Sequence, residues 1–277
     1  MSLAHLTFVA FTGLRTEHVL LDVLFAGLPW CGGWGFRFTP TALPLWLTGV
    51  VVDSQRLLHP LGTVHTGDIW QLDARLFPAP GGTNWADYLH TRINPVLDFF
   101  TGFSYGAFLY EFFAVAIFFY LARQPGRSRA MAWAFLIANV VGGLGHMLYP
   151  VAPPWYVLQH GMGPADVVHA VGSPAGCARF DAMLHIHYFE KFYARNPHVF
   201  GAMPSLHIAY PTLVVLFTWH RGWRWRIPTL GFAALVAFSA VYLTHHYIVD
   251  LLAGLITAGA SGWAANRWFG GARHPGP

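Results

Sequence analysis

The sequence predicts an all-α polytopic membrane protein, built as a six-helix transmembrane bundle with a long extracytoplasmic lid loop. Apolar residues make up 55% of the 277 residues, charged residues only 10%, and the mean hydropathy is +0.43. Apolar segments recur along the chain at roughly 20 residues, the length that crosses a bilayer core. This composition excludes an ordinary soluble domain. Its few basic residues lie beside apolar segments, so we expect no nucleic-acid binding.

The amino-terminal part should contribute the first span. Residues 1–14 are apolar but lack a basic leader and a clean cleavage site, so we expect no removed signal peptide. Apolar stretches follow at residues 19–36 and 38–52, and one should span while the other lies at the interface or re-enters. The sequence leaves that choice open. Residues 65–73 suit an amphipathic interfacial helix, with a plain surface helix as the alternative.

Five more spans are expected at residues 103–122, 130–148, 206–219, 227–244 and 251–268. The first contains Glu111, for which a structural contact and a functional one both remain open. Small residues that permit close helix packing are Gly142, Gly143 and Gly145 in the second span, and Gly254, Ala258 and Gly262 in the last.

Residues 150–203 form the long loop. A connection of this length is usually functional or disordered, and its many aromatic side chains favour a packed lid. Its cations are Arg179, Lys191 and Arg195, and a phosphate group would need such partners.

Arginine distribution predicts the orientation. Eight arginines and no acidic residues lie in three segments, which are the loop after residue 122, the turn after His220 and the carboxyl-terminal tail. By the positive-inside rule these segments are cytoplasmic, so the lid loop lies outside the cytoplasm and both termini lie inside. Fifteen of the 16 basic residues are arginine, which favours a bacterial source and hence an inner membrane.

Two histidine motifs should meet at the lid side of the membrane. They are Pro204-Ser205-Leu206-His207 and His245-His246 with Asp250. His207 and His246 lie 39 residues apart, which suits two crossings joined by a tight turn. Asp250 stands at i+4 from His246, so it can accept a hydrogen bond from one ring nitrogen and leave the other nucleophilic. Ser205 stands at a helix start, where backbone N–H groups favour phosphate oxygens.

These motifs resemble a known family. The stretches 201–207 and 242–250 look like the second and third motifs of the type-2 phosphatidic acid phosphatase superfamily, closest to the branch that contains inositol phosphorylceramide synthase. The segments 149–156, 161–165 and 172–181 support that branch. The similarity covers roughly residues 65–260. We expect one membrane domain of residues 1–277, in which residues 1–94 supply the first span and interfacial segments and residues 95–268 form the catalytic core.

Two departures separate the chain from the plain phosphatases. The superfamily's third motif has an arginine six residues before the histidine, where this chain has Ala240, and a lysine- and arginine-containing first motif is missing around Pro153 and Pro154. The phosphate-binding arginine must therefore come from elsewhere, and the resemblance favours Arg179. It also implies substrate contacts for Trp155 and Tyr156.

The resemblance implies a lipid headgroup transferase. His246, oriented by Asp250, would attack the phosphorus of phosphatidylinositol, and His207 would protonate the departing alcohol before a ceramide-like hydroxyl takes the phosphoinositol group. His245 is the alternative nucleophile and otherwise a substrate contact.

Other functions and sites remain open. The chain could be a lipid phosphate phosphatase, or a non-catalytic lipid-binding or transport protein. We expect no cofactor and no metal, because the pair His185 and His187 lacks further ligands nearby. Cys31 and Cys177 could pair only if both lie outside the cytoplasm. The expected partners are a phospholipid donor, a lipid acceptor and the membrane, and the sequence does not predict the oligomeric state.

Overall fold

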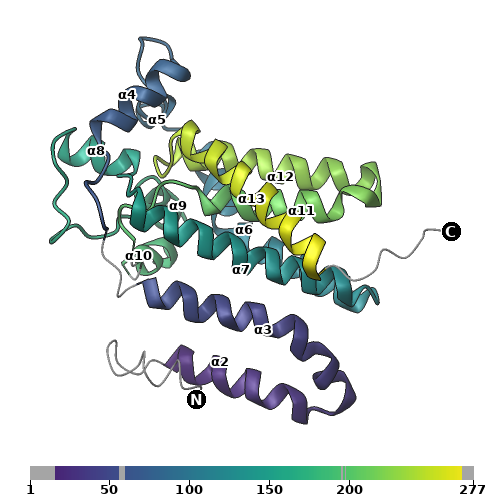
Figure 1. The fold of residues 1–277 in the computed structure, drawn as a ribbon. Coiled ribbons are helices and arrows are strands. Elements are labelled where there is room, and N and C mark those ends of the chain that lie inside the picture. Colours follow the sequence, from purple (N-terminus) through teal and green to yellow (C-terminus); the bar gives the residue numbers. More distant parts are fainter. Residues whose placement is uncertain (1–15, 56–59, 195, 197, 270–277) are drawn as a thin grey trace.

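The computed structural model describes residues 16–55, 60–194, 196 and 198–269. The predictions for residues 1–14 and for Arg195 lie outside these residues. Within them the protein is helical, and five long helices lie side by side as a bundle (Figure 1). These are α6 (Pro95–Leu121), α7 (Pro125–Leu148), α11 (Leu206–Thr218), α12 (Trp223–Tyr242) and α13 (Ile248–Phe269). The class predicted from composition is therefore confirmed as all-α.

Local sequence explains where the bundle helices begin. The Asn94 side chain accepts hydrogen bonds from the backbone N–H groups of Val96 and Leu97, and Pro95 occupies the first turn of α6. Pro125 occupies the first turn of α7 in the same way. Gly222, with a φ of 86°, makes the sharp turn between α11 and α12. These short connections place neighbouring helices antiparallel.

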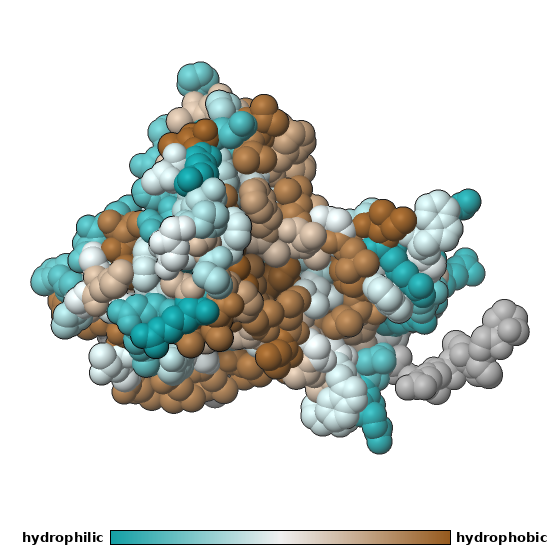
Figure 2. Space-filling model, turned by 90° about the horizontal axis from the view of Figure 1, so that it is seen from above, coloured by the Kyte–Doolittle hydropathy of each residue, from teal (hydrophilic) through white to brown (hydrophobic). Residues whose placement is uncertain are grey.

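Four of the described helices are long and apolar enough to cross a membrane: α6, α7, α12 and α13. They match four of the expected spans to within a few residues, except that α6 begins at Pro95, eight residues before the predicted start. Apolar residues cover the middle of the face shown in Figure 2, and hydrophilic residues gather toward both ends. A belt of this kind suits the hydrocarbon core of a bilayer, so the chain is an integral membrane protein.

An antiparallel hairpin lies beside the bundle. It consists of α2 (Thr16–Gly27), the 3-10 turn η1 (Leu28–Trp30) and α3 (Gly32–Ser54), and α3 packs against α7. The chain reverses before Gly32, whose φ is 75°, so the end of the apolar stretch 19–36 belongs to the same helix as the stretch 38–52, and α3 continues through Pro40 and Pro44. At 1.5 Å per residue α2 is roughly 18 Å long and is too short to cross alone. α3, with 23 residues, has the length to cross but is not among the four helices that are also apolar enough.

Short helices cover the end of the hairpin and bundle that lies opposite η1. They are α4 (Gly67–Leu76), α5 (Trp85–His90), α8 (Pro154–His160), α9 (Cys177–Leu184) and α10 (Tyr188–Tyr193). Isolated parallel bridges join His65 to Val151 and Val151 to Gly201. The described residues of the long loop therefore pack on this end, tied both to the segment before α4 and to the start of α11.

Glycines let the helices beneath this cap approach closely. A Cβ on Gly254 would lie 2.3 Å from the Ser205 carbonyl oxygen, and one on Gly145 would lie 2.6 Å from Pro204. Ala258 is fully buried, and a Cβ on Gly262 would contact Leu213. The small residues singled out in the last span therefore line its contact with α11, the helix that carries His207.

Replacing Gly254 with alanine is expected to lower stability by about 1–3 kcal/mol, because the added methyl group must displace backbone of α11. Thermal unfolding in detergent would measure the shift. Gly259→Ala in the same helix is the matched control, since its Cβ meets nothing within 4 Å, and it should unfold at the same temperature or higher. Equal behaviour of the two variants would contradict this packing.

Candidate active site

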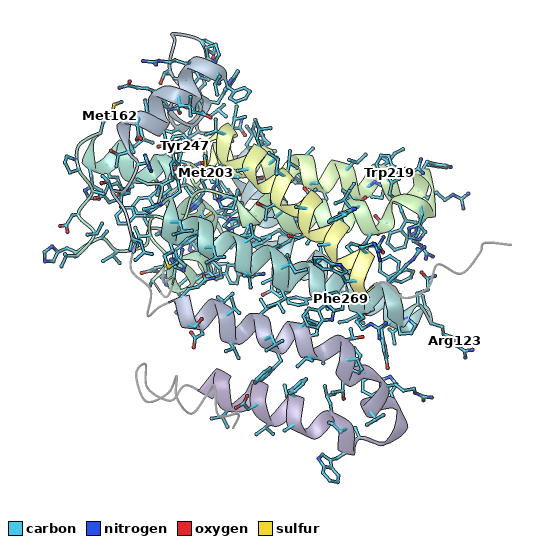
Figure 3. The ribbon with its side chains drawn as sticks, in the orientation of Figure 1. Arg123, Met162, Met203, Trp219, Tyr247 and Phe269 are labelled. Atoms are coloured by element: carbon cyan, nitrogen blue, oxygen red, sulfur yellow. The ribbon has the colours of Figure 1, made fainter. Side chains whose placement is uncertain are left out.

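The two histidine motifs meet at the capped end of the bundle. His207 lies in the first turn of α11, and His246 lies in the connection between α12 and α13. Nδ1 of His207 is 3.0 Å from Nε2 of His246. Figure 3 shows that Met203 and Tyr247, which flank the two motifs, lie at this end, whereas Arg123, Trp219 and Phe269 lie at the other. The sequence spacing thus returns both rings to one membrane face.

Backbone contacts fix the tautomers of this pair. Nδ1 of His246 lies 2.9 Å from the carbonyl oxygen of Ala202, which can only accept, so this nitrogen carries the proton. In the neutral ring Nε2 of His246 then has a free electron pair, and Nδ1–H of His207 donates to it. The arrangement supplies an unprotonated nitrogen on one ring and a proton donor on the other, as nucleophilic and general acid catalysis require.

Asp250 lies behind His246 and is fully buried. Its Oδ2 is 3.5 Å from Nδ1 of His246, farther than the Ala202 oxygen, and accepts a hydrogen bond of 2.9 Å from the backbone N–H of Tyr247. Its carbonyl oxygen accepts from the backbone N–H of Ser205. The predicted carboxylate therefore lies behind His246. The hydrogen bond that Nδ1 of His246 was predicted to donate to it goes instead to the Ala202 carbonyl oxygen.

We expect Asp250→Asn to lower kcat by about 10- to 100-fold. The loss is smaller than the about 10⁴-fold of a protease triad, where removing the carboxylate permits the wrong histidine tautomer. Here the Ala202 carbonyl still holds the tautomer, and only the attraction between a charged ring and a carboxylate is lost, about 1.5–3 kcal/mol. Turnover of a lipid phosphodiester would measure the effect, and a loss above 10⁴-fold would show that Asp250 alone sets the tautomer.

A cavity of about 50 Å³ adjoins the two imidazoles. Among the predicted site residues, His207, His246, His245 and Trp155 line it. The His245 ring is stacked between Tyr105 and Tyr193, and its Nε2 lies 3.2 Å from the Pro174 carbonyl oxygen. Burial, and next the charge of His246, lower the pKa of His245 to about 3, so this ring is neutral.

Three predicted substrate contacts do not line the cavity. Arg179 on α9 donates from Nε to Asp98 at 2.8 Å and lies over the Tyr242 ring. The Tyr156 hydroxyl accepts from the backbone N–H of Asp166. Ser205 is fully buried behind the site, and its hydroxyl meets no hydrogen-bond partner in the part of the chain that the structure describes. Among the residues predicted to contact the substrate, Trp155 and His245 thus line the cavity.

Sequence reasoning missed three residues beside the site. Tyr105 on α6 and Tyr193 on α10 line the cavity. Asp73 on the predicted amphipathic helix is buried and accepts from the backbone N–H of Val249 in the first turn of α13. Burial raises the pKa of Asp73 to about 6. Its only signal in the sequence was a polar residue on an otherwise apolar helix face. Because Asp73 binds the first turn of α13, its helix supports α13 as well as forming part of the surface.

Several other candidates have structural contacts. His146 is buried, and its Nε2 lies 3.1 Å from the Pro204 carbonyl oxygen. Cys31 and Cys177 are free thiols, the first exposed and the second buried. Glu111 has a buried Oε2 without a hydrogen-bond partner among the described residues, so the structural pair considered for it is not formed there.

Comparisons with known proteins agree with this geometry. The chain is 29% identical over 271 residues to a phosphoinositol dihydroceramide synthase of Bacteroides thetaiotaomicron, covering 95% of this chain and 88% of that protein. It is 35% identical over 179 residues to an inositol phosphorylceramide synthase catalytic subunit of Schizosaccharomyces pombe, covering 64% of this chain and 42% of that protein. The inositol phosphorylceramide synthase of Candida albicans is 35% identical over 175 residues, with 62% and 37% covered. The chain thus spans less than half of these two fungal relatives.

No solved structure matches the chain. The family model described as the PAP2 superfamily matches residues 68–264, which is more than half of the sequence and includes both histidine motifs. The chain therefore belongs to the PAP2 superfamily.

Proposed function

We propose that this protein is a membrane phosphotransferase that moves phosphoinositol from phosphatidylinositol to the hydroxyl of a ceramide-like lipid. The observation that carries the proposal is the pair of imidazoles of His207 and His246, 3.0 Å apart beside a capped cavity. The bacterial relative is a phosphoinositol dihydroceramide synthase and the two fungal relatives are inositol phosphorylceramide synthases, which favours phosphoinositol as the transferred group and a ceramide-like lipid as the acceptor.

The proposed reaction is a double displacement. Nε2 of His246 attacks phosphorus while the bond to the diacylglycerol oxygen breaks. His207, which must be protonated on both ring nitrogens for this step, gives that oxygen the proton from Nδ1 and becomes a neutral ring. The product of this step is a phosphohistidine that carries the inositol group. The acceptor hydroxyl then gives its proton to His207 and attacks phosphorus, which breaks the N–P bond and restores His246.

Substrate binding must separate the two rings first. A hydrogen bond of 3.0 Å between Nδ1 and Nε2 leaves no room for phosphorus between them. The phosphodiester would replace this bond and bring its phosphorus within about 3–3.5 Å of Nε2 of His246, the range of a near-attack geometry. The resting contact holds Nε2 of His246 in a hydrogen bond until a substrate replaces it.

The same proposal includes a topology. α3, α6, α7, α11, α12 and α13 form six spans, with residues 1–94 as the first span and interfacial segments of a single membrane domain and residues 95–268 as its catalytic core. The lid of residues 150–203 and the site face outside the cytoplasm of a bacterial inner membrane. The arginines after α6 and around η3 (Trp219–Arg221), at the end opposite the histidines, support this orientation.

Purified protein incubated with phosphatidylinositol labelled in the inositol ring, with and without dihydroceramide, tests the function. The expected products are an inositol-labelled sphingolipid and diacylglycerol. Labelled free inositol phosphate formed at the same rate with or without acceptor would instead establish the phosphatase alternative. Formation of neither product, with binding of the lipid intact, would establish a non-catalytic lipid-binding protein.

A further inference from the structure

Two buried tyrosines face the same cavity with unused hydroxyl groups. Tyr105 is 1% exposed and Tyr193 is 5% exposed, and both line the cavity beside His207 and His246. The two hydroxyls lie close enough for one to donate to the other, and no other residue that the structure describes offers either of them a hydrogen-bond partner. A buried hydroxyl without a partner costs free energy, and native proteins rarely keep one without a reason. Even when one phenol donates to the other, the second hydroxyl proton has no acceptor, which indicates that a ligand in the cavity supplies it.

Ring stacking holds these phenols rigidly beside the imidazoles. Tyr193 stacks on His245 at 4.6 Å between ring centroids, His245 stacks on Tyr105 at 5.1 Å, and Tyr105 stacks on His207 at 4.3 Å. The planes of each pair differ by 15° or less. The column joins α10 in the lid to α6 and α11 in the bundle, so the hydroxyls are positioned before a substrate binds.

The donors that surround the cavity are neutral. Among the described residues, no lysine or arginine lines it. Arg179 donates to Asp98 instead and does not line the cavity, and Ala240 stands where the superfamily's third motif has an arginine. Neutral hydrogen-bond donors can stabilise one negative charge in a buried site, whereas a second uncompensated charge is costly to bury.

We propose that the hydroxyls of Tyr105 and Tyr193 bind the two non-bridging oxygens of the substrate's phosphate, and that this pair selects a phosphodiester over a phosphomonoester. A phosphodiester carries one negative charge, whereas a phosphomonoester carries nearly two at pH 7. The inference rests on the proposed function and deepens it, because it names the residues that would exclude lipid phosphates as donors.

The test uses Tyr105→Phe and Tyr193→Phe in the full chain, each of which removes only the hydroxyl. Two quantities are measured: kcat/KM for headgroup transfer from phosphatidylinositol, and the affinities for glycerophosphoinositol and inositol 1-phosphate by calorimetry. We expect the unmodified protein to bind the diester more tightly than the monoester. Each variant should lose about 10- to 100-fold in kcat/KM and in diester affinity, with no fall in melting temperature.

Tyr210→Phe is the matched control. The Tyr210 hydroxyl is also buried, but it donates to Asn139 in the bundle and does not line the cavity, so diester affinity should be unchanged. Diester affinity within twofold of the unmodified protein in both cavity variants would overturn the inference, as would equal affinity for both ligands. These binding results stand even if the unmodified protein transfers no headgroup, an outcome that would count against the proposed function alone.

Discussion

Replacing His246 with alanine is expected to abolish headgroup transfer, lowering kcat by on the order of 10⁴-fold or more. The variant loses the ring nitrogen Nε2 that faces the proton donor His207, while Nδ1 of the same ring is held by the Ala202 carbonyl. Water cannot replace this nucleophile without changing the product from a new phospholipid to free inositol phosphate. The labelled-lipid assay would measure the loss.

A trapping experiment separates the nucleophile from its neighbour. With labelled phosphatidylinositol and no acceptor, the unmodified protein should retain label that is stable to base and lost in acid, as expected of a phosphohistidine. His246→Ala should retain none, whereas His245→Ala should still retain it, because His245 is neutral and stacked between two tyrosines. Label retained by His246→Ala and lost by His245→Ala would reverse the assignment. His220→Ala, in η3 at the other end of the bundle, is the control that should keep full activity.

The pairing of the two motifs could be predicted because it depends on lengths. Two antiparallel apolar segments joined by a short turn return residues 207 and 246 to one end of the bundle in almost any packing, and hydropathy marks both segments in the sequence. Asp250 could be predicted in the same way, since positions four apart share a helix face. These inferences use only the period of a helix and the thickness of a bilayer, and they position the catalytic candidates without any tertiary contact.

The surroundings of the pair could not be predicted, because they depend on contacts between distant segments. Nδ1 of His246 donates to the backbone carbonyl of Ala202. Every residue carries such a carbonyl group, so the sequence does not mark this one as the partner. The aromatic column takes one ring from α6, one from α10 and two from the motifs. Arg179 was favoured as the cation that would bind the phosphate. A buried carboxylate also needs a cationic partner, and in the structure Asp98 on α6 forms an ion pair with Arg179.

Replacing His207 with glutamine is expected to lower kcat with phosphatidylinositol by about 10²- to 10⁴-fold, the usual contribution of a general acid or base. Glutamine can still donate a hydrogen bond to Nε2 of His246, but it cannot give a proton to the departing diacylglycerol oxygen. An inositol phosphodiester of 4-methylumbelliferone leaves as a stable anion that needs no proton. The first-turnover release of this fluorescent alcohol should therefore be nearly as fast in His207→Gln as in the unmodified protein.

The comparison between the two leaving groups decides what His207 does. A residue that only positions His246, through the 3.0 Å contact between their rings, would slow both substrates equally when it is replaced, because the attack on phosphorus is common to both. A general acid affects only the substrate whose leaving group must be protonated. Equal losses on the two substrates would therefore contradict the general-acid role and leave His207 as a positioning residue. A loss confined to the lipid would assign the proton transfer to the ring that the Tyr105 stack holds against the nucleophile.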